Sequence, residues 1–337
     1  MRQISLWILI FSWIPQLIFV RFCQNHPEWV DQYYAQTIYP TVQHLRSIFF
    51  GYIPFSVGDC LYGVVGLTGI YLFFGRVKKM FRQPLIALLQ GAALLAAIHL
   101  FFQLSWGLNY YRTALAETMQ VPKSYDNWEL ESTTLKLLNQ TNRLHQILAK
   151  NDSLAVVFPK HNAYYNRVLG NASSKISLWS LPLSYMGYGG YLNPFTGEAQ
   201  INGQLPTLAF ITTSAHEQAH QSGIAAENEA NFLAFLKTYK HANPYIRYAG
   251  YSFALRYCWN ALYRNHPDCA TEIASKLRIG VRKDYQILQN FWLAHQNPLQ
   301  PVINNIYDHF LKANGQQEGV HSYSQVVAFL IQHRYHF

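Results

Sequence analysis

Three long apolar runs occupy the first third of the chain, and each is close to the length that crosses a bilayer. Residues 4–20 and 84–106 carry no formal charge, and residues 53–74 carry only Asp59. A transmembrane helix needs about 20 consecutive, predominantly apolar residues, because hydrocarbon offers no hydrogen bonds to the backbone. The chain is 50% hydrophobic and only 13% charged, which favours a membrane protein. We therefore expect residues 1–106 to form a transmembrane region with three spans.

The charges beside these runs predict the side that each end faces. Arg76, Lys78, Lys79 and Arg82 lie in the short connection between the second and third runs, with no acidic residue among them. Basic residues concentrate in short cytoplasmic loops, so everything after the third run is expected outside the cytoplasm. No small-x-small cleavage pattern follows the first run, which favours an uncleaved anchor over a signal peptide.

Residues 107–337 hold no further span-length apolar run, and we expect them to form one mostly helical domain with a small sheet. An amphipathic helix is expected at residues 127–150. Short strands are expected at residues 155–158 and 198–202, and glycines predict a loop at residues 185–192. Further helices are expected at residues 206–222, 226–241, 245–264, 269–295, 302–314 and 323–335.

The basic residues and the cysteines exclude some classes of partner and site. The net charge of +9 is diffuse, without a run of five Lys or Arg, so no nucleic-acid partner is expected. Membrane lipid is the expected partner of a mildly basic surface.

The cysteines form no C-x-x-C pair, which argues against a cysteine zinc site. Cys258 and Cys269, eleven residues apart, are expected either as a disulfide or as two small buried thiols.

The segment His216-Glu217-Gln218-Ala219-His220 carries the most specific chemistry. Residues four apart share one face of a helix, so both imidazoles are expected to point at one place. Two neutral imidazoles bind Zn²⁺, and a neighbouring carboxylate can take a proton from a metal-bound water. The spacing therefore predicts a zinc hydrolase site with Glu217 as general base. The alternative is a solvated or capping pair of histidines.

A hydrolytic zinc needs a third protein ligand and one open position. Gly223 predicts the end of the histidine helix, and the next helix carries Glu227 and Glu229. At 100° per residue these two point about 160° apart, and Glu227 shares its face with small residues that allow close packing. We therefore favour Glu227 as third ligand, with Glu229 as the alternative. Asn231 is expected either to support a ligand histidine by a hydrogen bond or to be a plain helix contact.

The pattern H-E-x-x-H followed by E-x-x-A-N resembles the gluzincin metallopeptidases, in which a Glu on the following helix completes the metal site. The six-residue gap between His220 and Glu227 is shorter than in most of them. The chain is also similar to an uncharacterised family of bacterial membrane proteins with three N-terminal transmembrane helices and an external zincin-like α+β domain. That resemblance implies a multi-pass protein of the bacterial cell membrane with an extracytoplasmic C-terminal domain. It lies in residues 54–59, 106–112, 193–199, 215–232 and 319–323.

The expected function is that of a membrane-anchored, zinc-dependent metallopeptidase hydrolysing peptide or protein substrates outside the cytoplasm. Tyr323, His321 and Tyr191 are candidates for stabilising the transition state, with a purely structural role as the alternative for each. Residues 198–202 are expected either to be an edge strand that pairs with an extended peptide or to be an ordinary strand of the sheet. Two alternatives stay open: a catalytically inactive zincin-like binding or assembly module of the cell envelope, and a zinc amidase acting on cell-wall material.

Overall fold

The computed structural model describes residues 3–122, 124–170, 174–316 and 325–337, and most of these residues are helical. The prediction of a mainly helical chain with a small sheet is confirmed. The elements of the N-terminal part are α1 (Gln3–Phe11), α2 (Trp13–Asn25), α3 (Pro27–Trp29), the π-helix η1 (Val30–Ile38), α4 (Tyr39–Phe50), α5 (Val57–Arg82), α6 (Pro84–Ser105) and the 3₁₀ helix η2 (Gly107–Tyr111).

The elements that follow form the larger part of the molecule. They are α7 (Leu115–Thr118), α8 (Asn127–Leu148), α9 (Asn162–Val168), β1 (Ser174–Ile176), α10 (Ser180–Met186), β2 (Gly190–Leu192), β3 (Ala199–Ile201), α11 (Thr207–Gln221), α12 (Glu227–Thr238), α13 (Pro244–Asn265), α14 (Pro267–Ser275), α15 (Ile279–Ala294), α16 (Gln300–Ala313), α17 (Val326–His333) and η4 (Arg334–His336).

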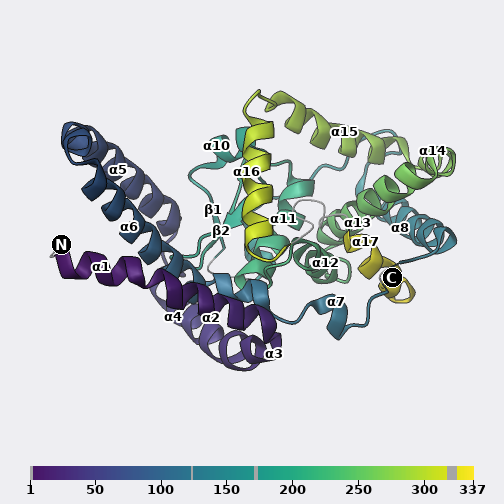
Figure 1. Ribbon diagram of the computed structural model, residues 1–337. Coiled ribbons are helices and arrows are strands. Elements are labelled where there is room, and N and C mark those ends of the chain that lie inside the picture. The colour runs from purple at the N-terminus through teal and green to yellow at the C-terminus, as the bar shows by residue number, and fades with distance from the viewer. Residues whose placement is uncertain (1–2, 123, 171–173, 317–324) are drawn as a thin grey trace.

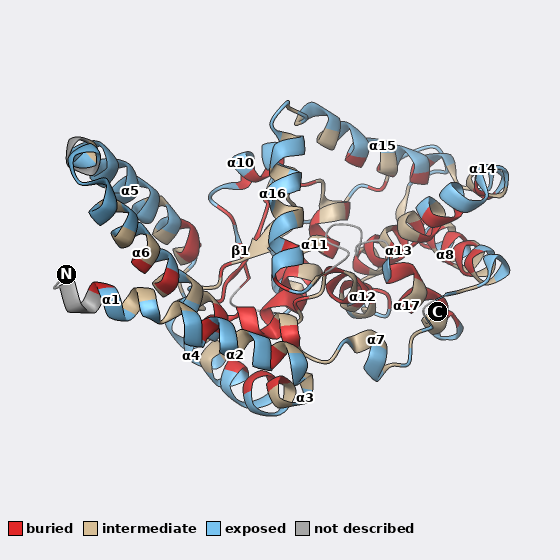
Figure 2. Ribbon diagram, in the orientation of Figure 1, coloured by how far each residue is buried: buried red, intermediate tan, exposed pale blue. Residues whose placement is uncertain are grey.

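Three helical stretches are long and apolar enough to cross a membrane: Leu6–Asn25, Val57–Val77 and Pro84–Ser105. They correspond to the three predicted spans. The first runs from α1 into α2 and is interrupted at Ser12, close before Pro15, which has no N–H to donate to the carbonyl four residues earlier. The hairpin of α5 and α6 projects from the rest of the molecule (Figure 1) with a largely exposed surface (Figure 2). Such an apolar surface suits hydrocarbon rather than water.

The main hydrophobic core lies among the helices of residues 107–337, where α8, α11, α12, α13 and α17 pack on one another. Buried residues concentrate on these helices in Figure 2. The predicted amphipathic helix at 127–150 is confirmed as α8, which buries Leu130, Leu137, Leu138 and Leu144 at helical spacing. Its first turn is closed by a capping box between Asp126 and Glu129, which satisfies free backbone N–H groups.

The sheet has three strands in the order β1-β3-β2. β3 pairs with β1 in parallel and with β2 antiparallel. The predicted strand at 198–202 is present as β3, and it is the ordinary sheet strand of the two alternatives rather than an edge strand, because both of its edges are paired. β2 takes an edge instead. The prediction of a loop at 185–192 is also wrong, since this segment contains the end of α10 and all of β2.

Two further predictions fail because of contacts with distant parts of the chain. Residues 155–158 form no strand, and the N–H of Val156 donates to the Asp284 carboxylate 3.1 Å away rather than to a neighbouring strand. The single helix predicted at 269–295 is two helices, α14 and α15. The side-chain amide of Asn142 satisfies the backbone at this break by bonding the Lys276 carbonyl and the Arg278 N–H.

Cys258 and Cys269 form no disulfide, because all four cysteines are free. Cys258 is fully buried in the main core and Cys269 is half-buried against it. Cys258 therefore packs as a small apolar side chain, which was the other expectation.

Two buried carboxylates join the beginning of α5 to the sheet. Glu198, next to β3, accepts a hydrogen bond of 2.7 Å from the N–H of Gly58. Asp59 of α5 accepts hydrogen bonds from the N–H of Leu178, at 2.7 Å, and from the hydroxyl of Tyr191 on β2. Both carboxylates are fully buried, and a buried charge is stable only when it is paired or hydrogen-bonded. The second span and the sheet are therefore held in one fixed arrangement.

Candidate functional site

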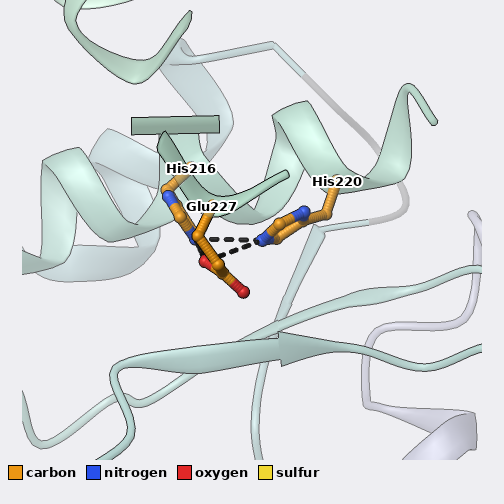
Figure 3. Close-up of side chains that lie close together, drawn as sticks. All are labelled: His216, His220 and Glu227. Atoms are coloured by element: carbon orange, nitrogen blue, oxygen red, sulfur yellow. Dashed lines mark hydrogen bonds and ion pairs between the residues drawn. The ribbon is translucent and has the colours of Figure 1, made fainter. Parts of the chain in front are cut away.

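Two successive helices bring three potential ligand atoms to one point (Figure 3). His216 and His220 lie one turn apart on α11, and Glu227 is the first residue of α12. The two Nε2 atoms are 3.0 Å apart. The Glu227 Oε2 atom is 3.2 Å from Nε2 of His216 and 3.5 Å from that of His220. His220 and Glu227 are buried and His216 is half-buried, so the cluster is largely screened from water.

The donor set and its spacing fit a metal ion. In a tetrahedral site with ligands about 2.0–2.1 Å from the metal, neighbouring ligand atoms lie about 3.3 Å apart. The three separations of 3.0, 3.2 and 3.5 Å bracket that value. Glu227 Oε2 is buried and lies beside the Nε2 atoms of both histidines, so it faces the position that a metal ion would take. Two imidazoles and one carboxylate could therefore hold a divalent cation.

The electrostatics of the cluster already favour a positive charge beside Glu227. Burial lowers the pKa of His220, but attraction to the Glu227 carboxylate outweighs it and raises that pKa to about 9. Burial also disfavours the charged form of Glu227, yet His220 and His216 hold its pKa well below the usual range. The carboxylate is therefore anionic, and a cation bound at this point would take over the role of the charged imidazole.

Backbone groups orient the His220 ring. Its Nδ1 donates to the carbonyl of Ile224, 2.6 Å away, which leaves Nε2 as the nitrogen with a free lone pair in the neutral ring. The carbonyl reaches the ring because the chain reverses at Gly223, where φ is +87°, a conformation that only glycine adopts without strain. The helix stop predicted at Gly223 thus also positions a ligand.

Tyr307 of α16 supports the carboxylate from the other side, since its hydroxyl donates to Glu227 Oε1 at 2.7 Å. This contact leaves Oε2 facing the histidines. Outer partners of this kind orient metal ligands, and their loss typically weakens metal affinity by about 10–100-fold. We expect Tyr307→Phe to weaken zinc binding within that range while the protein stays folded. Competition with a chelator of known affinity measures the change, and an unaltered dissociation constant would show that this hydrogen bond does not support the site.

Glu217 lies beside the cluster and lines the same cleft. It is buried, and its Oε2 atom has no hydrogen-bond partner among the described residues. Burial raises its pKa, partly offset by the attraction of the two imidazoles. A carboxylate with an unused oxygen and a raised pKa is suited to accept a proton.

Gly190 of β2 allows the strand to approach Glu217 closely. A Cβ atom at this position would lie 2.6 Å from the carbonyl oxygen of Gln200 and 2.8 Å from Cγ of Glu217. The carbonyl belongs to the central strand and cannot move without distorting the sheet. We expect Gly190→Ala to lower the free energy of unfolding by about 1–3 kcal/mol, the usual cost of overpacking. Denaturant unfolding measures this, and Gly66→Ala, where no atom lies within 4 Å, is the matched control.

The other predicted site residues lie in different surroundings. Glu229 points away from the histidines and accepts a hydrogen bond from the N–H of Leu115 at 2.5 Å. Asn231 is buried and lines the cleft, but its Nδ2 atom bonds no described residue, ligand histidines included. The hydroxyl of Tyr191 is bonded to Asp59. His321 and Tyr323 lie outside the described residues.

The cluster lies in a cleft of about 790 Å³. Its walls include polar groups that sequence reasoning did not single out: Tyr188, Arg256, Tyr257 and Tyr307. No local sequence pattern indicates them, because they come from three separate segments. Tyr188 precedes β2, Arg256 and Tyr257 belong to α13, and Tyr307 belongs to α16. These segments are adjacent only in the folded chain.

The fold and this cleft define a mostly helical protein with three apolar helices suited to a membrane and a buried His-His-Glu cluster. The chain belongs to the DUF3810 family of proteins of unknown function, whose model matches residues 34–331. The expectation of an uncharacterised family is thus confirmed. No curated protein and no solved structure matches the chain.

Proposed function

We propose that this protein is a membrane-anchored, zinc-dependent metallopeptidase. The observation that carries the proposal is the convergence of His216, His220 and Glu227 at 3.0–3.5 Å, with Glu217 buried beside them in the same cleft. Nitrogen and carboxylate ligands suit Zn²⁺, and three protein ligands leave a fourth position for water or substrate. When bound there, Zn²⁺ would supply a Lewis acid and make a water molecule acidic near neutral pH.

The protein groups around this position have separate tasks in peptide hydrolysis. Glu217 takes the proton of the attacking water and later delivers it to the leaving amine. Its raised pKa brings it closer to the pH at which both transfers are efficient. Tyr188, Arg256 and Tyr257 line the cleft and are candidate donors to the negative charge that develops on the carbonyl oxygen. They take the role expected for Tyr191, whose hydroxyl is engaged elsewhere.

The edge strand β2 offers a place for the substrate backbone. Its residues line the cleft, one edge pairs with β3, and the other has no strand partner among the described residues. An extended peptide can add to such an edge through main-chain hydrogen bonds. This assigns to β2 the role that the sequence suggested for residues 198–202.

The location of the site outside the cytoplasm is part of the proposal. It follows from Arg76, Lys78, Lys79 and Arg82 near the end of α5, since such basic connections stay in the cytoplasm. Both α5 and α6 then place their opposite ends, and the cleft beside them, on the other side. Cysteine accessibility to a membrane-impermeant reagent, with cysteines introduced at Lys79 and at exposed Trp128, tests this orientation.

A catalytically inactive binding module is less well supported. Burying Glu217 with one oxygen unpaired costs free energy. A binding module would gain nothing from a buried, unpaired carboxylate at this position.

The decisive experiment uses the full-length protein in proteoliposomes. Bound metal is quantified by mass spectrometry, and cleavage of peptide libraries and of cell-wall peptides is followed in parallel. Zinc with peptide cleavage supports the proposal. Cleavage of cell-wall amides alone would indicate the amidase, and zinc without any cleavage would indicate the binding module.

A further inference from the structure

We infer that the cleft receives a polypeptide segment tethered to the same membrane, namely the juxtamembrane stretch of a membrane-anchored protein. This inference rests on the proposed peptidase function, whose substrate class it names. Four features of the structure carry it: the origin of the cleft walls, the fixed height of β2, an apolar surface at the rim, and the aromatic lining.

The walls of the cleft include residues of the candidate spans themselves. Tyr62 of α5 and Phe102 of α6 line the same cleft as the His-His-Glu cluster. Tyr62 is five residues after the first residue of its span and Phe102 is three residues before the last of its span. At 1.5 Å per residue these positions are about 7.5 Å and about 4.5 Å along the helices. The cleft therefore extends to the boundary of the hydrocarbon region.

The edge strand β2 is held beside the same end of α5, at the boundary of the hydrocarbon region. Tyr191, the middle residue of β2, donates its hydroxyl to the carboxylate of Asp59, in the first turn of α5. Glu198 accepts the N–H of Gly58 in the same turn. A peptide that pairs with β2 is consequently placed beside the first turn of a span rather than out in solvent.

An apolar surface continues from the span to the rim of the cleft. Trp179, just before α10, donates its indole N–H to the Asp59 carbonyl at 3.1 Å. Leu178 is 59% exposed, Trp179 42%, Leu181 53% and Tyr185 47%. Tryptophan, tyrosine and leucine side chains in such a position are typical of the membrane interface. Because α10 leads directly into the cleft wall at Gly187, a chain lying at the bilayer surface reaches the site without leaving the interface.

The lining of the cleft suits the flank of a membrane anchor. Among the described residues that line the cleft, Arg256 is the only Lys or Arg, so the cleft offers little long-range attraction to acidic soluble peptides. The remaining walls are rich in aromatic side chains, which favour the apolar and aromatic residues found beside anchors. These aromatic lining residues include Tyr62, Phe102, Tyr188, Tyr257, Trp292 and Phe310.

The test compares one peptide library in two forms. Full-length protein, loaded with zinc and reconstituted in phosphatidylcholine vesicles, receives the library either free or joined to a single apolar helix through spacers of increasing length. Tethering confines the peptide near the site and raises its effective concentration, so we expect the tethered form to be cleaved at least about tenfold faster. Cleavage sites should lie within about ten residues of the anchor, because an extended chain advances only about 3.3 Å per residue.

A second measurement reports binding without catalysis. A photo-crosslinking amino acid replaces Tyr62 in the Glu217→Gln protein, and Tyr52 provides the matched control. Tyr52 is an exposed tyrosine five residues before α5 and outside the cleft. We expect the tethered peptide to crosslink at position 62 in severalfold excess over position 52, and over the free peptide at either position.

The outcomes separate this inference from the proposed function. Equal cleavage of free and tethered peptides, with equal crosslinking at the two positions, overturns the inference and leaves the peptidase intact. Absence of cleavage in both forms, with crosslinking still concentrated at position 62, overturns the peptidase and retains the cleft as a site for tethered segments. Absence of both signals overturns both.

Discussion

Glu217→Gln is expected to retain bound zinc and to reduce peptide hydrolysis by about 10²–10⁴-fold, the usual contribution of a general base. Glutamine has nearly the same shape as glutamate, so the buried side chain still fills its place against Gly190. It cannot accept a proton at neutral pH, however, and only this function is lost. Steady-state cleavage of a library-derived peptide, together with metal analysis of the same sample, measures both quantities.

Glu229→Gln is the matched control for this variant. Glu229 is also a buried glutamate, but it does not line the cleft and its Oε1 accepts the N–H of Leu115, which an amide oxygen can also do. The Glu229→Gln protein should therefore hydrolyse peptides at a rate close to that of the wild type. Undiminished hydrolysis by Glu217→Gln would contradict the assigned role of this carboxylate.

Glu227→Ala is expected to lower zinc affinity by more than about 100-fold, which exceeds the effect typical of outer partners. The variant loses one of three ligand atoms and leaves the hydroxyl of Tyr307 without its carboxylate acceptor. In the wild type, zinc at 100 times its dissociation constant stabilises the folded protein by about 2.7 kcal/mol. The melting temperature of the wild type should therefore fall when a chelator removes the metal, and that of Glu227→Ala should not change.

The same measurement distinguishes the two acidic residues at the beginning of α12. Glu229→Gln should bind zinc with the affinity of the wild type, because its carboxylate faces α7 rather than the histidines. If Glu229→Gln lost zinc and Glu227→Ala kept it, the ligand assignment would be reversed.

The features that could be predicted from the sequence depend on residues close together in the chain. The spans follow from runs of apolar residues, and His216 and His220 share a face because they are four residues apart on one helix. The choice of Glu227 over Glu229 needed only the helical phase and the turn at Gly223. The structure places these side chains as the spacing indicates.

The features that could not be predicted depend on contacts between distant segments. Residues 190–192 begin with Gly190, directly after Gly189, and resemble a loop, yet they form an edge strand because they pair with β3. The hydrogen bond between Tyr191 and Asp59 joins residues 132 positions apart in the chain. The hydrogen bond between Tyr307 and Glu227 joins residues 80 positions apart. No local sequence pattern predicts such pairs, since each residue taken alone is an ordinary polar side chain.

Local composition and periodicity were sufficient to predict three apolar helices and a helix with two histidines on one face, because both signals act within a few turns of helix. Packing between distant segments set three other features: the hydrogen bond from Tyr307 to Glu227, the open edge of β2, and the contribution of the apolar helices α5 and α6 to the cleft walls. These depend on how helices and strands far apart in the chain pack together, where burial and hydrogen bonding act on pairs that no local spacing relates.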